Sequence, residues 1–303
     1  MKLRAKLSHF TVFDLFIYAI MIFLIIVTLL PFLNILAISL SDYKYISRVE
    51  VNLIPKGFNI TMYKVLFQTP LVMRGYLNTV LYAGGTCLIV LVLNSIYAYA
   101  LSKPDLPFKL PLTIFLVITM FVSGGLIPLY LVVLLLHGID SFWVMVLPGT
   151  VGAWTVLMMR TFFNEIPYSL TESAMIDGAN EAKILTSIIA PLSKPLIATI
   201  SLWTIVAKWN SWFDSQIYLH DVNKYSIQMI VREVTTQALN KVGNGTSTVV
   251  SNISSQQATL LGKIIPLNYT YAMLIMVCLP IIILYPFFQR YFVQGTRLGS
   301  IKG

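Results

Sequence analysis

The chain has 303 residues, of which 57% are hydrophobic and only 11% are charged, and its formal net charge is +9. A soluble globular domain carries about 25% charged residues, so this composition excludes an ordinary water-soluble protein and also disordered or collagen-like chains. A basic balance suggests nucleic acid as a partner in a soluble protein. Here the basic residues lie mostly between apolar runs, where they act as topology signals, so we expect no nucleic-acid partner.

The apolar residues gather in runs that are long enough to cross a bilayer, which takes about 20 residues. A sixth stretch, 196–220, is also long enough but contains Lys208 and Asp214. The sequence therefore predicts an all-α, polytopic membrane protein with about six transmembrane helices in one domain, 1–303. The five runs without charge are 15–40, 75–102, 110–139, 141–159 and 264–289.

The distribution of Lys and Arg predicts the orientation in the membrane. With both termini in the cytoplasm, eleven basic residues lie inside, mostly in short segments, and nine are spread over two longer outer segments, 42–74 and 221–263. The positive-inside rule gives most weight to short loops and favours this orientation. Pro104 and Pro107 then belong to a tight inner turn, because two prolines so close together cannot continue a helix.

The sequence offers no chemistry for catalysis or for holding a metal. Cys87 and Cys278 both fall inside predicted spans, so neither a disulfide framework nor a zinc site is expected. No Ser/His/Asp, Cys/His or paired-carboxylate arrangement lies within the spans. There is also no phosphate-binding Gly-x-x-x-x-Gly-Lys-Ser/Thr loop, so any ATP that drives this protein must bind to another polypeptide.

The one substantial inner segment, 166–195, carries the strongest local signal. Ser169 and Glu172 have the spacing of a capping box that begins a helix, and Gly178 can end that helix in a left-handed conformation. Asn180 can cap a second short helix, which two later prolines limit. A helix, a glycine elbow and a helix outside the bilayer suit docking into a partner protein; an interfacial helix pair lying on the membrane is the alternative.

The charged residues of the stretch 196–220, which is the fifth span in chain order, mark a second candidate site. Lys208 and Asp214 each cost roughly 2.5–3.5 kcal/mol at the centre of a lipid-exposed helix, so such charges usually face a water-filled path or a partner helix. Asn210 and Asp214 are four residues apart and are expected to share one helix face. Trp212 adds an aromatic ring, so Asn210, Trp212 and Asp214 are our candidates for lining or gating a polar path through the membrane. The alternatives are snorkelling of Lys208 and an interfacial aromatic belt that contains Trp209 and Trp212.

The inner segment resembles the cytoplasmic coupling loop of permeases from ATP-binding-cassette (ABC) importers. That family's pattern is Glu-Ala-Ala, three residues, Gly, nine residues, Ile, one residue, Leu-Pro, and this chain departs from it by Ser173 for the second alanine and Ala190 for the leucine. The chain looks most similar to maltose-type carbohydrate permeases of the branch for polysaccharides and complex oligosaccharides. The matching residues are Glu172, Ala174, Asp177, Gly178, Ala179, Ile188 and Pro191 in the loop, the stretch 121–128, the stretch 209–214 and the ending 299–303.

The resemblance implies a type I ABC importer permease in a bacterial cell membrane. It implies a heterodimer with a second homologous permease, two ATPase subunits that hold ATP and Mg, and an extracytoplasmic binding protein that delivers an oligosaccharide. This chain itself would carry no cofactor and no enzyme activity. A secondary transporter or channel, or an ABC permease for a non-sugar solute, is the alternative. The residues implied in ATPase coupling are Glu172, Ser173, Ala174, Asp177, Gly178 and Ala179, and the candidates for the substrate path are Lys208, Trp209, Asn210, Trp212 and Asp214.

Overall fold

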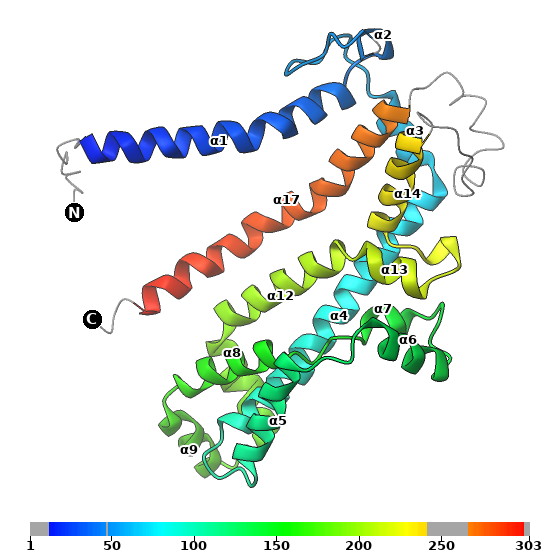
Figure 1. Cartoon of the computed structure of the whole chain (residues 1–303). Coiled ribbons are helices and arrows are strands. Elements are labelled where there is room, and N and C mark those ends of the chain that lie inside the picture. Colours follow the sequence, from blue (N-terminus) through cyan, green and yellow to red (C-terminus); the bar gives the residue numbers. More distant parts are fainter. Residues whose placement is uncertain (1–11, 47, 241–265, 300–303) are drawn as a thin grey trace. The chain divides into compact units, whose positions relative to one another are not determined.

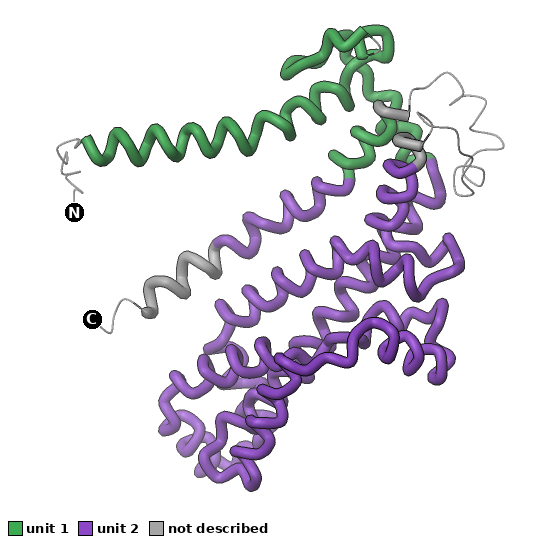
Figure 2. Tube along the Cα trace, viewed as in Figure 1, with its two compact units in different colours: residues 1–68, 251–276 green, residues 69–250, 277–303 purple. Residues whose placement is uncertain are grey.

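The structure of the chain is a computed structural model that describes residues 12–46, 48–240 and 266–299, and the described part contains helices and no strand, which confirms the all-α prediction (Figure 1). It divides into two compact units, which are described separately (Figure 2). The two units do not test whether 1–303 works as one permease domain, so that stays a prediction. Unit 1 comprises residues 1–68 and 251–276, and unit 2 comprises residues 69–250 and 277–303.

Unit 1 consists mainly of one long apolar helix, α1 (Val12–Ser39). No residue in the most apolar window of α1 is buried in the protein, so this helix presents its side chains to lipid or to a partner. The predicted outer segment 42–74 contains two short helices, α2 (Tyr43–Ile46) and α3 (Thr61–Gln68). The beginning of α17 (Pro266–Gly299) completes the unit.

Unit 2 is built around α4 (Pro70–Ser102), which packs against α8, α12 and α14. This helix begins five residues earlier than the predicted run 75–102, because Pro70 occupies its first turn, where a missing N–H costs nothing. The partners of α4 are α8 (Ala153–Asn164), α12 (Lys194–Trp209) and α14 (Ile227–Asn240), and the buried residues that join α4, α8 and α12 include Ala98, Val156, Met159 and Ile200.

The predicted span at 110–139 is not straight. It consists of α5 (Lys109–Phe121) and α6 (Leu126–Leu135), whose axes differ by 111°. The bend lies at Ser123-Gly124-Gly125, where Gly125 has a φ of +79°, a left-handed value that glycine adopts without steric cost. These small residues therefore break the span and are not simply a helix-packing surface.

The predicted span at 141–159 is also interrupted, between α7 (Phe142–Val146) and α8. The break contains Pro148 and Gly149, and its backbone is tied to α4 by the fully buried Asn94. The Asn94 side-chain amide donates to Thr150 O at 2.7 Å and its carbonyl oxygen accepts from Gly152 N at 3.2 Å. One buried side chain thus satisfies backbone groups that a continuous helix would satisfy itself.

The stretch predicted as the fifth span ends α12 at Trp209 and continues as α13 (Trp212–Tyr218). The predicted outer segment 221–263 contains the 3₁₀ helix η2 (Val222–Lys224) and α14, an amphipathic helix that we did not predict. The rest of that segment, 241–263, lies outside the described residues, as do both chain ends.

Among the described residues, three helices are long and apolar enough to cross a membrane: α1, α4 and the part of α17 over Asn268–Gln289. Counting α5 with α6 and the helical stretch Glu181–Leu192 with α12 as bent spans raises the number to five. The prediction of about six therefore agrees roughly in number, whereas the predicted continuity of the middle spans was wrong.

Candidate functional site

The inner segment folds as the helix, elbow and helix that the sequence predicts, but its first helix begins differently. Helix α9 (Tyr168–Ile176) has Pro167 as its N-cap residue and no side-chain cap. Ser169 and Glu172 lie inside α9, so the predicted capping box was wrong. The backbone of Pro167 already has a φ of −57°, close to the helical value, and the helix therefore starts before Ser169 can cap it.

The elbow at Gly178 is a Schellman motif. Gly178 has a φ of +79°; its N–H donates to Met175 O at 3.0 Å, and the N–H of Ala179 donates to Ala174 O at 2.9 Å. These two bonds satisfy carbonyls at the end of α9. Asn180 caps α10 (Glu181–Ile184) by accepting from Lys183 N at 2.9 Å, as predicted.

The chain then returns to the membrane helices through a short irregular stretch. The π-helix η1 (Leu185–Ile189) follows α10 and leads into α11 (Ala190–Leu192). Ser193 is fully buried and lies at the junction with α12, where the helical stretches bend by 84°. The bend lies between the two prolines that were predicted to limit the second helix, and it aims the elbow away from α12.

The six residues implied in ATPase coupling divide into two groups by burial. Ala174 and Ala179 are partly buried and pack against the hydrophobic core of unit 2, where a small side chain fits. The others face solvent: Glu172, Ser173, Asp177 and Gly178. Beside them Ile176 is 86% exposed, at the last position of α9. An exposed isoleucine framed by polar residues suits a protein contact.

The segment is anchored to the end of α4 by a charged cluster that we did not predict. Glu181 forms an ion pair with Lys103, whose ammonium nitrogen lies 2.8 Å from the carboxylate, and the buried Tyr99 donates a hydrogen bond to the same oxygen. Lys103 also lies over the Tyr99 ring, 4.6 Å from its centroid. The three side chains link α10 directly to the membrane helix that forms the core of unit 2.

This cluster shifts the pKa of both charged groups toward their charged forms. Burial alone raises the pKa of Glu181, but Lys103 and the Tyr99 hydroxyl outweigh it, so the pKa lies below its ordinary value of 4.5. Burial alone lowers the pKa of Lys103, but Glu181 and Tyr99 again outweigh it, and the pKa lies above its ordinary value of 10.5. The pair is therefore charged at every pH between these two values.

The second candidate site lies where α12 gives way to α13. Lys208 and Asp214 form an ion pair across this break, with 3.0 Å between the ammonium nitrogen and a carboxylate oxygen. The Lys208 side chain is only 13% exposed, so it pairs with Asp214 instead of extending freely toward the surface. Asn210 ends α12 and Asp214 belongs to α13, so the prediction that they share one helix face was wrong.

Side chains at the break compete with the backbone and explain why α12 ends there. The Asn210 amide donates to Val206 O at 2.9 Å, and the Ser211 hydroxyl donates to Lys208 O at 2.8 Å. Asn210 also accepts a hydrogen bond from Gln228 of α14 at 3.2 Å. The break is therefore held by polar side chains from two helices, which the helical spacing of the sequence did not indicate.

The two tryptophans at the break have different surroundings. Trp209 is 2% exposed, donates its ring N–H to Val277 O at 3.2 Å and lies 6.0 Å from the Tyr76 ring, so it holds α12 against its neighbours. Trp212 is half-buried, and the guanidinium carbon of Arg232 lies 3.6 Å from its ring centroid. Of the two, Trp212 is the one placed among exposed polar groups.

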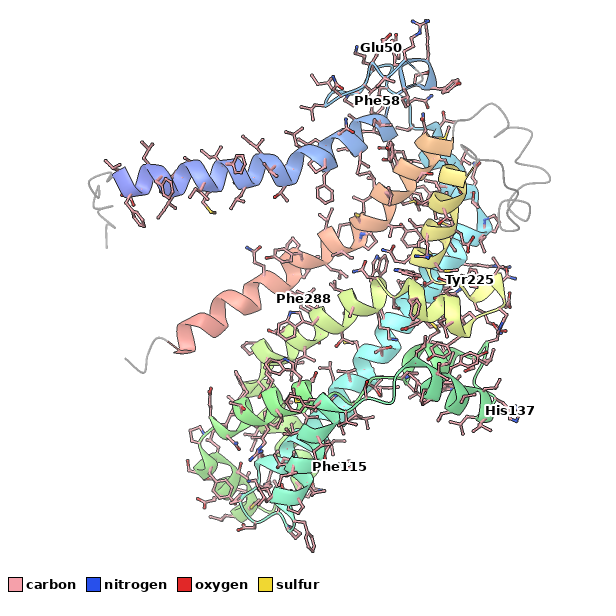
Figure 3. The ribbon with its side chains drawn as sticks, viewed as in Figure 1. Glu50, Phe58, Phe115, His137, Tyr225 and Phe288 are labelled. Carbon is pink, nitrogen blue, oxygen red and sulfur yellow. The ribbon has the colours of Figure 1, made fainter. Side chains whose placement is uncertain are left out.

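On the other face of the break, Asp140 ties together the loops around α7 and α13. Its carboxylate accepts from the backbone N–H groups of His220 at 2.7 Å and Asp221 at 2.9 Å. Burial alone raises the pKa of Asp140, but these donors and the nearby charges of His220 and Lys224 outweigh it and lower the pKa. His137 and Tyr225, near these loops, are labelled in Figure 3.

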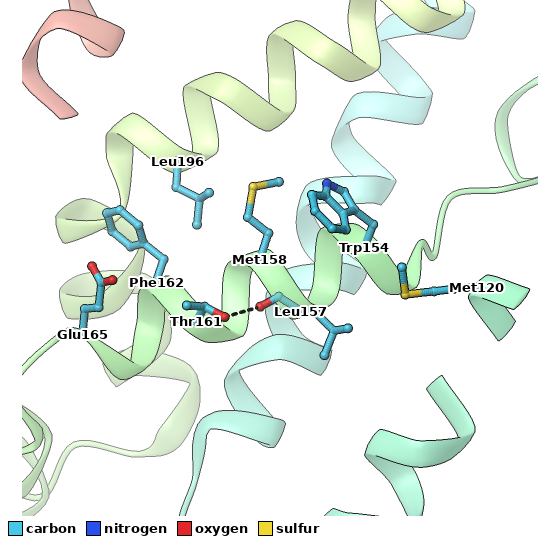
Figure 4. A pocket seen from close by; sticks show the side chains of 8 residues that line it. All are labelled: Met120, Trp154, Leu157, Met158, Thr161, Phe162, Glu165 and Leu196. Carbon is cyan, nitrogen blue, oxygen red and sulfur yellow. Dashed lines mark hydrogen bonds between the residues drawn. The ribbon is translucent and has the colours of Figure 1, made fainter. Parts of the chain in front are cut away.

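A pocket of about 450 Å³ lies beside α8 and is lined mainly by apolar side chains (Figure 4). Thr161 uses its hydroxyl in a hydrogen bond to Leu157 O at 2.9 Å, which leaves the Glu165 carboxylate and the ring N–H of Trp154 as the polar side-chain groups of the lining. A sugar needs several hydrogen-bonding groups, so this pocket suits lipid tails or a partner helix better.

Comparison with known proteins places these features in a family, although no family model matches the chain. The chain is 34% identical to the polygalacturonan/rhamnogalacturonan transport system permease protein YtcP of Bacillus subtilis (strain 168), over 96% of this chain and 98% of that protein. It is 26% identical to the arabinooligosaccharides transport system permease protein AraQ of the same organism, over 98% and 100%.

A solved structure agrees with the sequence relatives. A chain of a bacterial ABC transporter involved in the import of the acidic polysaccharide alginate matches with a TM-score of 0.82 and 25% identity, covering 94% of this chain and 99% of that one. The fold, the apolar helices and the relatives all agree with the resemblance that the inner segment indicated. The chain belongs to the membrane-embedded permease subunits of sugar ABC importers.

Proposed function

We propose that this chain forms half of the translocation path of an oligosaccharide importer in a bacterial cell membrane, with both termini in the cytoplasm. A second homologous permease supplies the other half, and an extracytoplasmic binding protein delivers the sugar. A pair of ATPase subunits binds ATP and Mg and hydrolyses the ATP, while this chain holds no cofactor. The match to an alginate importer over nearly the whole length of both chains carries this proposal.

The inner segment 166–195 is proposed as the contact with the ATPase. Glu172, Ser173, Asp177 and Gly178 face solvent around the exposed Ile176, whereas Ala174 and Ala179 seat the segment on the core. Glu181 is paired with Lys103 at the end of α4. A movement of the elbow would therefore be transmitted to this membrane helix through the ion pair. Such rigid coupling between a docking element and packed helices suits switching between two arrangements.

The break at 208–214 is proposed as the part of this chain that faces the sugar. Asn210 and Trp212 bring an amide and an aromatic ring to it, and the Lys208–Asp214 ion pair adds charged groups that need water or a polar partner. Trp209 supports this arrangement from its buried position.

Purification from native membrane tests the assembly. Tagged chain is expected to co-purify with a second permease and an ATPase, and the complex in proteoliposomes is expected to take up an oligosaccharide only with ATP and a binding protein. A chain that transports without any ATPase would refute the proposal. In the assembled complex, Asn210→Ala and Asp214→Ala are expected to lower uptake or change its specificity; unchanged uptake and specificity in both would remove the break from the path.

A further inference from the structure

Arg232 of α14 is held in an unusual way. The central carbon of its guanidinium lies 3.6 Å from the centroid of the Trp212 ring, yet the residue as a whole is exposed. Within the described part of the chain, Arg232 has no ion pair and no hydrogen bond from its side chain. The ring therefore fixes the position of the guanidinium while its N–H groups stay available in the guanidinium plane.

The charges around Arg232 do not neutralise it. Lys208 and Asp214 satisfy each other across the break. Glu233, the next residue of α14, forms no ion pair with Arg232 within the part of the chain that the structure describes. An exposed arginine side chain is usually mobile, so fixing one over an aromatic ring costs side-chain entropy. A surface that only has to be soluble does not need an arginine fixed in this way.

The side-chain amide of Gln228 lies on the same face of α14 as Arg232. Gln228 is one helical turn before Arg232, and its side chain donates to Asn210 at 3.2 Å. The guanidinium of Arg232 and the amide of Gln228 thus come from α14, the aromatic ring from Trp212 of α13, and a second amide from Asn210 at the end of α12. Amides suit sugar hydroxyls, and a planar guanidinium matches a carboxylate, which it binds through two parallel hydrogen bonds.

We propose that Arg232, positioned by Trp212, binds a carboxylate of an acidic oligosaccharide on its way through the permease. This inference rests on the proposed oligosaccharide path and names the class of sugar: chains that contain uronic acids. Trp212 then acts chiefly by orienting Arg232, because Arg232 covers one face of its ring, while Asn210 and Gln228 bind hydroxyl groups of the same sugar.

The test uses the complete importer purified from native membrane and placed in proteoliposomes with its binding protein. Uptake is measured for labelled oligogalacturonate, for the same oligosaccharide with its carboxylates methyl-esterified, and for a neutral malto-oligosaccharide. Arg232→Gln is compared with Arg232→Lys and with Arg48→Gln, which removes a charge from an exposed side chain of unit 1. Co-purification of the subunits and the basal ATPase rate check that each variant is assembled.

Wild-type complex is expected to take up oligogalacturonate, and Arg232→Gln is expected to raise the KM for it by about tenfold or more, as loss of a charged hydrogen-bond donor does. The KM of Arg232→Lys is expected to lie between those of the wild type and Arg232→Gln. This variant serves as the test if Arg232→Gln does not assemble. Arg48→Gln is expected to leave the KM for oligogalacturonate unchanged. Uptake of the uncharged sugars is expected to be unchanged in all variants.

Two results overturn the inference and leave the proposed function standing: uptake of neutral sugar without uptake of oligogalacturonate, or an unchanged KM for oligogalacturonate in both Arg232 variants. An equal loss of charged and neutral sugars in an assembled Arg232→Gln complex also overturns it, because that pattern indicates a structural role. Uptake of no oligosaccharide of any kind refutes the proposed function and the inference with it.

Discussion

The ion pair between Glu181 and Lys103 gives a prediction whose size follows from the structure. Removing either charge, by Glu181→Gln or Lys103→Met, is expected to lower the free energy of unfolding by about 1–2 kcal/mol. The Lys103 side chain is 18% exposed and that of Glu181 is 58% exposed, so solvent screens their attraction. The ion pair therefore contributes about 1 kcal/mol to the free energy of unfolding. Glu181→Gln also replaces the charged acceptor of the Tyr99 hydrogen bond by a neutral one, which accounts for up to about another 1 kcal/mol in that variant and not in Lys103→Met.

A double-mutant cycle separates the pair from its surroundings. Thermal unfolding of the purified complex can be followed with a thiol-reactive dye, because Cys87 is buried and reacts only when the protein opens. Each 1 kcal/mol corresponds to about 2–4 °C in Tm for a chain of roughly this size. The double variant is expected to lose about 1 kcal/mol less than the sum of the single variants. Lys183→Met, which removes an exposed charge from the same helix, is expected to change stability by less than about 0.5 kcal/mol.

The pH dependence has a defined direction. Because the pKa of folded Glu181 lies below 4.5, its contribution is complete above that pH and is lost as pH falls through the folded pKa. Because the pKa of folded Lys103 lies above 10.5, its contribution is complete below that pH and is lost as pH rises through the folded pKa. The coupling energy is thus expected in full at pH 7 and is expected to decrease as the pH is lowered below 4.5 through the folded pKa of Glu181. Strictly additive single variants at pH 7 would refute the argument.

Three further predictions concern docking, the elbow and the core. Ile176→Asp is expected to weaken co-purification of the ATPase by about tenfold or more, since Ile176 is 86% exposed, while Ile176→Leu retains it; equal retention by both would remove Ile176 from the contact. Gly178→Ala is expected to destabilise the complex by about 1 kcal/mol and Gly178→Asn by less, because no atom within 4 Å obstructs a Cβ and only the backbone conformation opposes it; equal Tm values for Ala and Asn would contradict this. Asn94→Leu is expected to cost about 2 kcal/mol or more by leaving Thr150 O and Gly152 N–H unpaired, and a Tm unchanged from wild type would show that other groups replace it.

Composition and local spacing predicted the class of fold and the elbow, because both depend on neighbours in the chain. Gly178 and Asn180 act through bonds to residues within a few positions, and the structure has those bonds as expected. The partners of Lys103 and Arg232 were not predictable, because Glu181 and Trp212 are brought to them by the packing of separate helices. The Pro-Gly pair at 148–149 is a sequence signal for the interruption before α8. Our prediction missed this interruption because it relied on hydropathy alone.

The capping-box error has a similar cause. Ser169 and Glu172 satisfy the spacing rule, but Pro167 starts α9 earlier, so the side chains never reach the orphan N–H groups. The same applies to Asn210 and Asp214, whose spacing has helical meaning only within an uninterrupted helix. Spacing rules therefore hold only where the backbone has first been shown to be continuous.

The bend between α5 and α6 limits how this protein can be produced. The N–H groups of Ser123, Gly124 and Gly125 make no backbone hydrogen bond within the described part of the chain, and the side chains on either side are exposed, with Phe121 at 83% and Ile127 at 72%. Hydrocarbon cannot satisfy such groups, so irregular backbone at membrane depth needs protein or water around it. Overproduction of this polypeptide alone should therefore give an orphan subunit that membrane proteases remove, whereas synthesis alongside its partner should preserve it.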